Sequence, residues 1–321
     1  MHYSLPYKTK QFFFVLIKLS IVFGAAYFIY NKLNSNADLS FSHFIEITSK
    51  KAVFSSKNVL FLLILSSCNW FLEILKWQNL VFPIKKITFK NALKQSLGAL
   101  SASLFTPNRI GEYGAKAIYF TSNYRKRIVG VNLLSNLLQM SVTVILGVIG
   151  FYFFINEYDV DINYYKLARL LLIILAVIAM ATFGIKKSKF KIKGFSIEKL
   201  KKFLTNYPKN KLYLGFILSL LRYVVFSFQF FVLLQIFSID ISYINAMMVI
   251  TSMYLLASII PSIFIFDIVI KGSVAVFLFS YLNINELIIL TIITIMWLLN
   301  FVFPSIFGSY YVLNFKLPKN E

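Results

Sequence analysis

Two short segments of the chain combine a proline with an acidic residue and a lysine that follows it four positions later. The residues are Pro107, Glu112 and Lys116 in the first segment and Pro261, Asp267 and Lys271 in the second. An acid placed four positions before a lysine is the favourable order for an ion pair on one face of a helix. Both segments lie in apolar surroundings, where an ionisable side chain is costly and needs a partner or a ligand.

Two interpretations of these segments stay open. A helix that begins after a proline break directs unpaired N–H groups and the positive end of its dipole into the protein, where they attract anions such as phosphate. Alternatively, Glu112 and Asp267 neutralise the helix starts and the lysines close salt bridges with them. Both can hold if a substrate displaces an internal partner.

Three further charged positions are candidates for the same site. Arg222 lies roughly 15 Å along its apolar segment at 1.5 Å per residue, so it either binds a lipid phosphate or pairs with Glu73 or Asp267. Arg109 lies in the first break and could face the same cavity. Glu73 has Lys76 one helical turn later, which favours a local pair near the inner interface. The candidate binding residues are Arg109, Glu112, Lys116, Arg222, Asp267 and Lys271, and the expected structural breaks are Pro107, Gly111 and Pro261.

Other chemistries find little support in the residue types. The single cysteine, Cys68, excludes a disulfide framework, and the two histidines, His2 and His43, lie outside the apolar segments. We therefore expect no metal site and no cofactor. No plausible Ser/His/Asp set and no phosphate-binding glycine-rich loop is present, so an enzyme is not expected. The net charge of +21 is carried by connecting segments, which argues against nucleic acid as the partner.

The elements that must position these residues are membrane-spanning helices. Hydrophobic residues make up 59% of the 321 residues and charged residues only 14%, and the apolar residues form long blocks that suit a bilayer. The expected fold class is an all-α integral membrane protein with about six spans. These are Gln11–Tyr30, Asn58–Val81, Ile128–Ile155, Tyr165–Ile185, Leu212–Phe237 and Glu286–Tyr310. Trp70 and Trp77 are expected to anchor the second span at the interfaces.

Basic residues fix the expected orientation. The lysine-rich loop 186–211 predicts a cytoplasmic side, and with it cytoplasmic N- and C-termini in a multi-pass protein of the cytoplasmic membrane. The acidic stretch Glu157–Asp161 is expected outside. No cleavable signal peptide is evident, so the first apolar segment is interpreted as a retained span.

The remaining apolar segments predict two broken-helix hairpins, at about 91–124 and 243–283. The first would enter from the cytoplasm and the second from outside, although the second could instead be two full spans. Residues 11–155 and 165–312 then share one order: two spans, a broken hairpin and one span. Such an inverted repeat, with helices interrupted near the bilayer midplane, is typical of transporters. We treat residues 1–321 as a single membrane domain.

The first motif resembles that of a known family. The run Thr106–Lys116 resembles the Pro-Gly-Arg-x-Gly-Glu-type motif in the membrane region of lysylphosphatidylglycerol synthase/flippase proteins. The stretch Ile260–Ser273 resembles that family's second motif, a proline-glycine turn followed by an acid and a basic residue, and Trp77 near Lys76 also fits. Asn108 replaces a frequent glycine, and the second motif lacks its usual glycines and has Asp267 where Glu is usual.

The resemblance implies a prokaryotic protein that moves a phospholipid or lipid-linked headgroup across the cytoplasmic membrane. Bifunctional relatives carry a soluble aminoacyl-transferase domain after the membrane part, whereas only Asn314–Glu321 follow the last span here. Transferase activity is therefore not expected, although the phosphatidylglycerol lysyltransferase label is possible by family.

We accordingly expect a flippase-like transporter whose partners are membrane lipids with anionic or zwitterionic headgroups. The alternatives are an ion- or proton-coupled transporter of a small solute, a membrane enzyme acting on a lipid-linked substrate, and a structural or accessory membrane protein.

Overall fold

The computed structural model describes residues 55–104, 106, 110–158, 160, 202–259 and 267–318, with the backbone alone for residues 267–270. Every regular element in this part of the chain is a helix. The helices are α3 (Ser56–Val81), α4 (Phe89–Ser103), α5 (Gly111–Ile118), α6 (Ser122–Glu157), α9 (Lys209–Ile236), α10 (Tyr243–Ile259), α11 (Asp267–Ser280), α12 (Glu286–Trp297), the π-helix η3 (Leu298–Val302) and α13 (Phe303–Leu313).

Within the described residues, four helices are long and apolar enough to cross a membrane. They are α3, α6, α9 and the continuous helix that α12, η3 and α13 form over Glu286–Leu313. These four match four of the six predicted spans. The other two predicted spans, Gln11–Tyr30 and Tyr165–Ile185, and most of the basic loop 186–211 lie outside the described residues.

Two pairs of shorter helices lie where the sequence predicts the two hairpins. In the first, α4 packs against α5; in the second, α10 packs against α11. Residues 260–266, which join α10 to α11, lie outside the described residues, so the second hairpin stays a prediction beside the alternative of two full spans.

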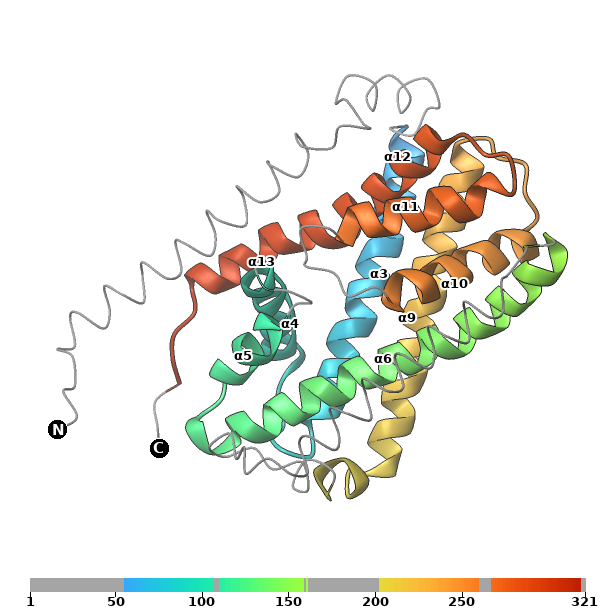
Figure 1. The fold of residues 1–321 in the computed structure, drawn as a ribbon. Helices are drawn as coiled ribbons and strands as arrows, with labels where there is room; N and C mark the ends of the chain where they lie inside the picture. Colours follow the sequence, from blue (N-terminus) through green and yellow to red (C-terminus); the bar gives the residue numbers. More distant parts are fainter. Residues whose placement is uncertain are drawn as a thin grey trace.

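The helices contact one another in a pattern that repeats when the halves are exchanged. At the centre α3 packs along α9, and Figure 1 shows that the two run in opposite directions. Around this pair α6 packs against α10, just as α13 packs against α4; likewise α5 packs against α6, and α11 against α12. If α3, α4, α5 and α6 of the first half are matched in order with α9, α10, α11 and the α12–α13 helix, each helix therefore contacts the counterparts of its equivalent's partners. Two halves related by a two-fold axis would produce this pattern.

Glycines allow the two equivalent helix crossings to be close. A Cβ atom at Gly150 of α6 would collide with Thr251 of α10, and one at Gly308 of α13 would collide with the carbonyl oxygen of Leu97 in α4. Beside the second crossing the Ser101 hydroxyl donates to the carbonyl oxygen of Ser305 over 2.8 Å. Small residues of this kind let helix backbones approach within a membrane, where dispersion forces replace the hydrophobic effect.

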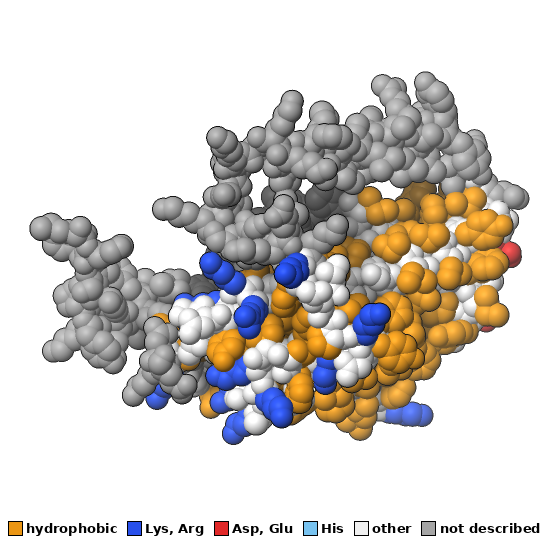
Figure 2. All heavy atoms as spheres, turned by 90° about the horizontal axis from the view of Figure 1, so that it is seen from below, with side chains coloured by type: hydrophobic (Ala, Val, Ile, Leu, Met, Phe, Trp, Pro, Cys, Tyr) orange, Lys and Arg blue, Asp and Glu red, His pale blue; other side chains and the backbone are white. Residues whose placement is uncertain are grey.

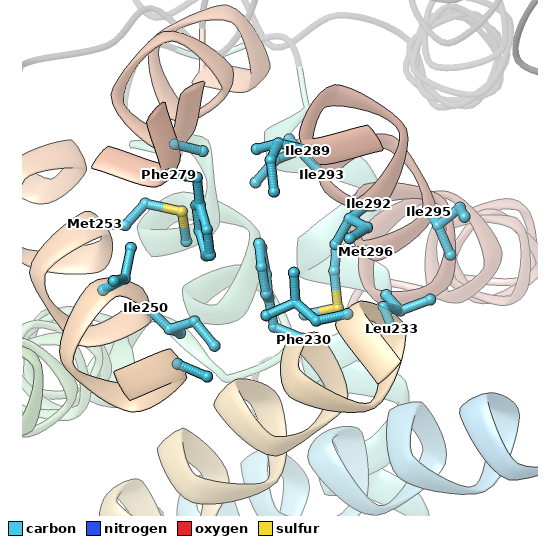
Figure 3. Packing of buried hydrophobic residues seen from close by; sticks show 14 of the residues in the cluster. Phe230, Leu233, Ile250, Met253, Phe279, Ile289, Ile292, Ile293, Ile295 and Met296 are labelled. Atoms are coloured by element: carbon cyan, nitrogen blue, oxygen red, sulfur yellow. The ribbon is translucent and has the colours of Figure 1, made fainter. Parts of the chain in front are cut away.

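An apolar core fills the space between α9, α10, α11 and α12 (Figure 3). Phe230 of α9 and Phe279 of α11 stack near its middle, with ring centroids 5.6 Å apart and planes 11° from parallel. Ile250 and Met253 of α10 are fully buried in the same cluster. This apolar core packs α10 and α11 against α9 and α12.

Outward-facing apolar residues cover the flanks of the long helices, as lipid contact requires. On α6, Ile145, Val148, Ile149 and Phe153 are each at least half exposed. A contiguous apolar surface of this extent would not be stable in water. The four long helices are therefore membrane helices, and the chain is a multi-pass membrane protein.

The two ends of the helix bundle differ in charge. Exposed basic residues gather at the end where α3 finishes and α6 and α9 begin, and Figure 2 shows them spread over this face. They include Lys85, Lys86, Lys90, Lys126, Arg127, Lys202 and Lys209. The exposed acids Glu157, Asp240 and Glu286 lie at the other end, together with Lys57 at the start of α3. This is the asymmetry that the positive-inside bias produces.

Candidate functional site: a buried charge network

Helix α3 carries an acid and a lysine in the interior of the protein. Glu73 Oε2 lies 2.7 Å from Lys76 Nζ, and the two side chains are 11% and 2% exposed. Their spacing of three residues places them on one face of the helix. Glu73 lies roughly 12 Å along α3 from its end at Val81, at 1.5 Å per residue. The local pair that the sequence predicted is confirmed, but it is buried.

Arg222 joins this pair from α9. Its Nη1 lies 2.8 Å from Glu73 Oε2, and its Nε donates to Asn69 Oδ1 over 3.0 Å. The guanidinium group therefore contacts α3 at two side chains one turn apart, which its planar array of donors favours. Of the two acidic partners that the sequence suggested for Arg222, the structure identifies Glu73.

A glutamine on α6 completes this part of the site. Gln139 Oε1 accepts from Lys76 Nζ and from Arg222 Nη1, each over 3.4 Å, and its Nε2 donates to the Ser219 carbonyl oxygen of α9 over 3.4 Å. Side chains from α3 and α9 therefore pair with the Glu73 carboxylate, and α6 supplies an acceptor for both of its cationic partners.

The first hairpin contributes the second ion pair. Glu112 Oε1 and Lys116 Nζ of α5 lie 2.7 Å apart, as their spacing of four residues predicted, and Lys116 is only 1% exposed. The same ammonium group donates to Asn132 Oδ1 of α6 over 3.0 Å. It also lies 4.1 Å from the centre of the Trp77 ring, a distance suited to a cation–π contact.

The two tryptophans of α3 are not interfacial anchors, contrary to the sequence prediction. Trp77 is fully buried, and its indole N–H donates to Gln95 Oε1 of α4 over 2.8 Å. Trp70 is 8% exposed and donates to the carbonyl oxygen of Asn300 over 3.0 Å. A buried indole needs a hydrogen-bond acceptor, and both rings find one inside the protein.

The two ion pairs belong to one charge network, by which we mean Glu73, Lys76, Glu112, Lys116 and Arg222. Lys116 lies over the ring of Trp77, the neighbour of Lys76 in α3, and its charge interacts with those of Glu73 and Lys76. The network contains three cations and two acids, so within the described residues it carries one surplus positive charge. Buried ion pairs contribute little net stability, because desolvation offsets their attraction.

Asn300 extends the hydrogen bonding around this network from Asn69 of α3 to Gln229 of α9. Its Oδ1 accepts from Asn69 Nδ2 over 3.0 Å, and its Nδ2 donates to Gln229 Oε1 of α9 over 2.8 Å. Gln229 Nε2 in turn donates to the Leu62 carbonyl oxygen over 3.0 Å. Asn300 lies in the π-helix η3, a feature that often occurs at functional sites.

The remaining predicted residues are placed only in part. Gly111 begins α5, and its N–H donates to Thr106 Oγ1 over 2.8 Å. Lys271 of α11 is half-buried, with Nζ 5.8 Å from the centre of the Phe301 ring. Asp267 begins α11, but its side chain is outside the described part, as are Pro107, Arg109 and Pro261. The structure therefore brings together Glu112, Lys116 and Arg222, and the predicted meeting of the two hairpins stays a prediction.

Sequence reasoning missed the uncharged members of the site. They are Asn69, Gln139, Asn132, Gln229 and Asn300. The available signal was their residue type, because a carboxamide inside an apolar span needs an interhelical partner. Among the described residues no group of three or more His, Cys, Asp or Glu side chains is placed to hold a metal ion. The site instead presents ammonium, guanidinium and amide donors, which suit an oxyanion.

The comparison with known proteins agrees with a site inside a membrane protein. A model of the family described as "Lysylphosphatidylglycerol synthase TM region" matches residues 15–308. Since this match covers most of the 321 residues, the chain belongs to that family. No curated protein matches the chain.

Proposed function

From membership in the lysylphosphatidylglycerol synthase transmembrane family we infer a role in membrane-lipid metabolism, and we propose that this chain is a flippase-like transporter. It moves a phospholipid or a lipid-linked headgroup across the cytoplasmic membrane of a prokaryote, and it does so without catalysing a chemical reaction. The observation that carries the proposal is the buried charge network, which lies between helices of both halves.

Energetic reasoning supports a functional role for this network. Charged side chains inside a membrane are rare, and they mark substrate or ion pathways because their burial needs a compensating gain. Replacing such a network with apolar side chains is often neutral for stability or favourable. Selection for stability alone therefore does not explain three cations and two acids at this position.

In the proposed mechanism the cations hold the lipid phosphate while the acyl chains stay in the surrounding bilayer. Lys116 and Arg222 each pair with an acid in the absence of substrate. In the proposed mechanism the phosphate displaces that acid and takes its place beside the cation. Arg109 and Lys271 are proposed as further phosphate ligands. Glu112 and Asp267 are proposed to tune the affinity, so that the lipid can leave.

The topology we propose has the basic end of the bundle in the cytoplasm, with both termini on that side. The two helix pairs α4–α5 and α10–α11 are then re-entrant hairpins that enter from opposite leaflets. The exchange-symmetric packing of the helices supports this inverted repeat.

The test is reconstitution of the protein into vesicles that contain fluorescent phospholipid analogues in both leaflets. A membrane-impermeant quencher then measures how fast inner-leaflet lipid reaches the outer leaflet. We expect Glu112→Gln, Arg222→Ala and Asp267→Asn to slow translocation, whereas Lys126→Gln, at an exposed position on α6, should not. Native rates in all three site variants would remove the site assignment, and currents evoked by a soluble solute without lipid movement would favour solute transport instead.

A further inference from the structure

A polar stripe on α6 faces the charge network, and two of its members each have a side-chain atom without a hydrogen-bond partner among the described residues. The stripe consists of Asn132, Ser135 and Gln139, whose spacing of three and four residues puts them on one face of the helix. Asn132 and Ser135 are fully buried. In the described part of the chain neither Asn132 Nδ2 nor Ser135 Oγ meets a hydrogen-bond partner.

Unpaired donors of this kind are unusual and need an explanation. Most buried polar side-chain atoms in native proteins are hydrogen-bonded, because an unpaired donor loses its interaction with water and gains nothing in return. The Asn132 side chain is well fixed, since its Oδ1 already accepts from Lys116 Nζ over 3.0 Å. Its amide N–H groups therefore remain available beside a buried cation.

The surrounding charges decide which kind of ligand these donors suit. Lys116, Lys76 and Arg222 outnumber Glu73 and Glu112 in the charge network, so a ligand with one negative charge would neutralise the described set. A phosphodiester has such a charge, and its oxygens accept hydrogen bonds without donating any. A ligand with a further positive charge would instead add to the surplus positive charge of the described set.

We propose that Lys116, Asn132 and Ser135 form a subsite for a singly charged phosphate oxyanion, with the ammonium, amide and hydroxyl groups as donors. This subsite rests on the proposed function only in assigning the oxyanion to a phospholipid headgroup. A headgroup with net charge −1 binds more tightly there than a zwitterionic one.

The experiment measures ligand binding and not transport. Purified protein in detergent is tested by thermal unfolding and by native mass spectrometry with phosphatidylglycerol, phosphatidylcholine, inorganic phosphate or glycerol phosphate. Native protein should retain phosphatidylglycerol in preference to phosphatidylcholine and unfold at a higher temperature in its presence.

Three variants test the assignment. Asn132→Asp places a carboxylate beside Lys116, so it should weaken phosphatidylglycerol binding by at least about tenfold while the free protein stays as stable as the native one. Ser135→Ala should weaken binding by roughly several-fold, because it removes one donor. The matched control is Ser141→Ala on the same helix, where the exposed hydroxyl donates to the Leu137 carbonyl oxygen; its binding should be unchanged. Native affinity in both Asn132→Asp and Ser135→Ala would overturn the proposal.

The ligand series separates the possible sources of the oxyanion. Stabilisation by phosphatidylglycerol alone assigns the subsite to lipid. Equal stabilisation by inorganic phosphate or glycerol phosphate keeps the subsite but assigns it to soluble phosphate compounds, which contradicts the lipid assignment. Variants that bind as native protein does, in a protein that still moves lipid, would remove the subsite and leave the proposed function standing. If the variants weaken binding but the native protein moves no lipid, the subsite would stand and the proposed function would be removed.

Discussion

Lys116 shows how a single charged residue can be kept inside a membrane protein. Its ammonium group has a carboxylate, an amide oxygen and an indole face around it, from Glu112, Asn132 and Trp77. Each partner comes from a different helix or turn, so the residue depends on tertiary structure although its ion pair is local.

The first prediction separates the structural role of this pair from its functional role. Lys116→Met leaves Glu112 buried without its cation and should lower the free energy of unfolding by about 3–5 kcal/mol. The double variant Glu112→Gln/Lys116→Met removes both charges and should recover most of that loss. Denaturant unfolding in detergent measures both, with the exposed Lys126→Met as control. A double variant as unstable as the single one would show that the pair itself holds the fold.

How far the sequence predicts this site depends on the distance between partners along the chain. The Glu112–Lys116 and Glu73–Lys76 pairs are within one helical turn and could be recognised from spacing alone. Arg222 was recognised as needing a partner, but choosing Glu73 requires knowing that α3 packs along α9. The residue type of Asn300 indicates that it needs a partner, but nothing local identifies Asn69 and Gln229 as those partners.

At the scale of helices, the crossings of α6 with α10 and of α13 with α4 hold the halves together. Both crossings rely on glycine, at Gly150 and Gly308. The long helices and the helix pairs were predictable, because the length of the apolar segments and the positions of the prolines can be read directly from the sequence. Their packing partners were not, since charge counting and length do not specify contacts between apolar surfaces.

The second prediction concerns the α4–α13 crossing. Gly308→Ala should lower the free energy of unfolding by roughly 1–3 kcal/mol, because the new Cβ meets the backbone of Leu97, which cannot rotate away. Gly114→Ala in α5 is the control: no atom lies near its Cβ position, so it should leave stability unchanged or raise it by about 0.5–1 kcal/mol. Thermal unfolding of both variants checks this, and equal effects would show that the crossing is not tight.

The third prediction concerns η3. Asn300→Ala removes the bonds to Asn69 and Gln229 and should cost about 1–3 kcal/mol of stability, because buried amide groups lose their partners. Asn314→Ala, at an exposed position whose amide donates to the Tyr310 carbonyl oxygen of its own helix, should change stability by less than about 0.5 kcal/mol. The comparison uses denaturant midpoints. A similarly small effect at Asn300 would mean that the π-helix does not depend on the polar link.

At the scale of the whole molecule, the separation of basic and acidic ends sets how the bundle sits in a bilayer. The basic end includes Lys126 and Lys209, and the acidic end includes Glu157 and Asp240. Membrane insertion keeps basic segments in the cytoplasm, so this asymmetry predicts one orientation for the entire chain.

The fourth prediction tests that orientation. Single cysteines replace Lys126 or Asp240 in a Cys68→Ser background, and intact cells are treated with a membrane-impermeant maleimide. The position at Asp240 should be labelled in intact cells, and the position at Lys126 only after the cells are opened. The opposite labelling would invert the topology and place the first hairpin's entrance outside.

The central claim is that the buried charge network handles lipid headgroups and is not merely a structural feature. The most direct measurement is the rate of phospholipid translocation in vesicles for native protein and for Glu112→Gln/Lys116→Met, with unfolding used to verify that both are folded. We expect the native protein to move lipid and the folded double variant to lose at least about tenfold in rate, in line with the loss of one charge-assisted contact. Equal rates in the two folded proteins would contradict the account.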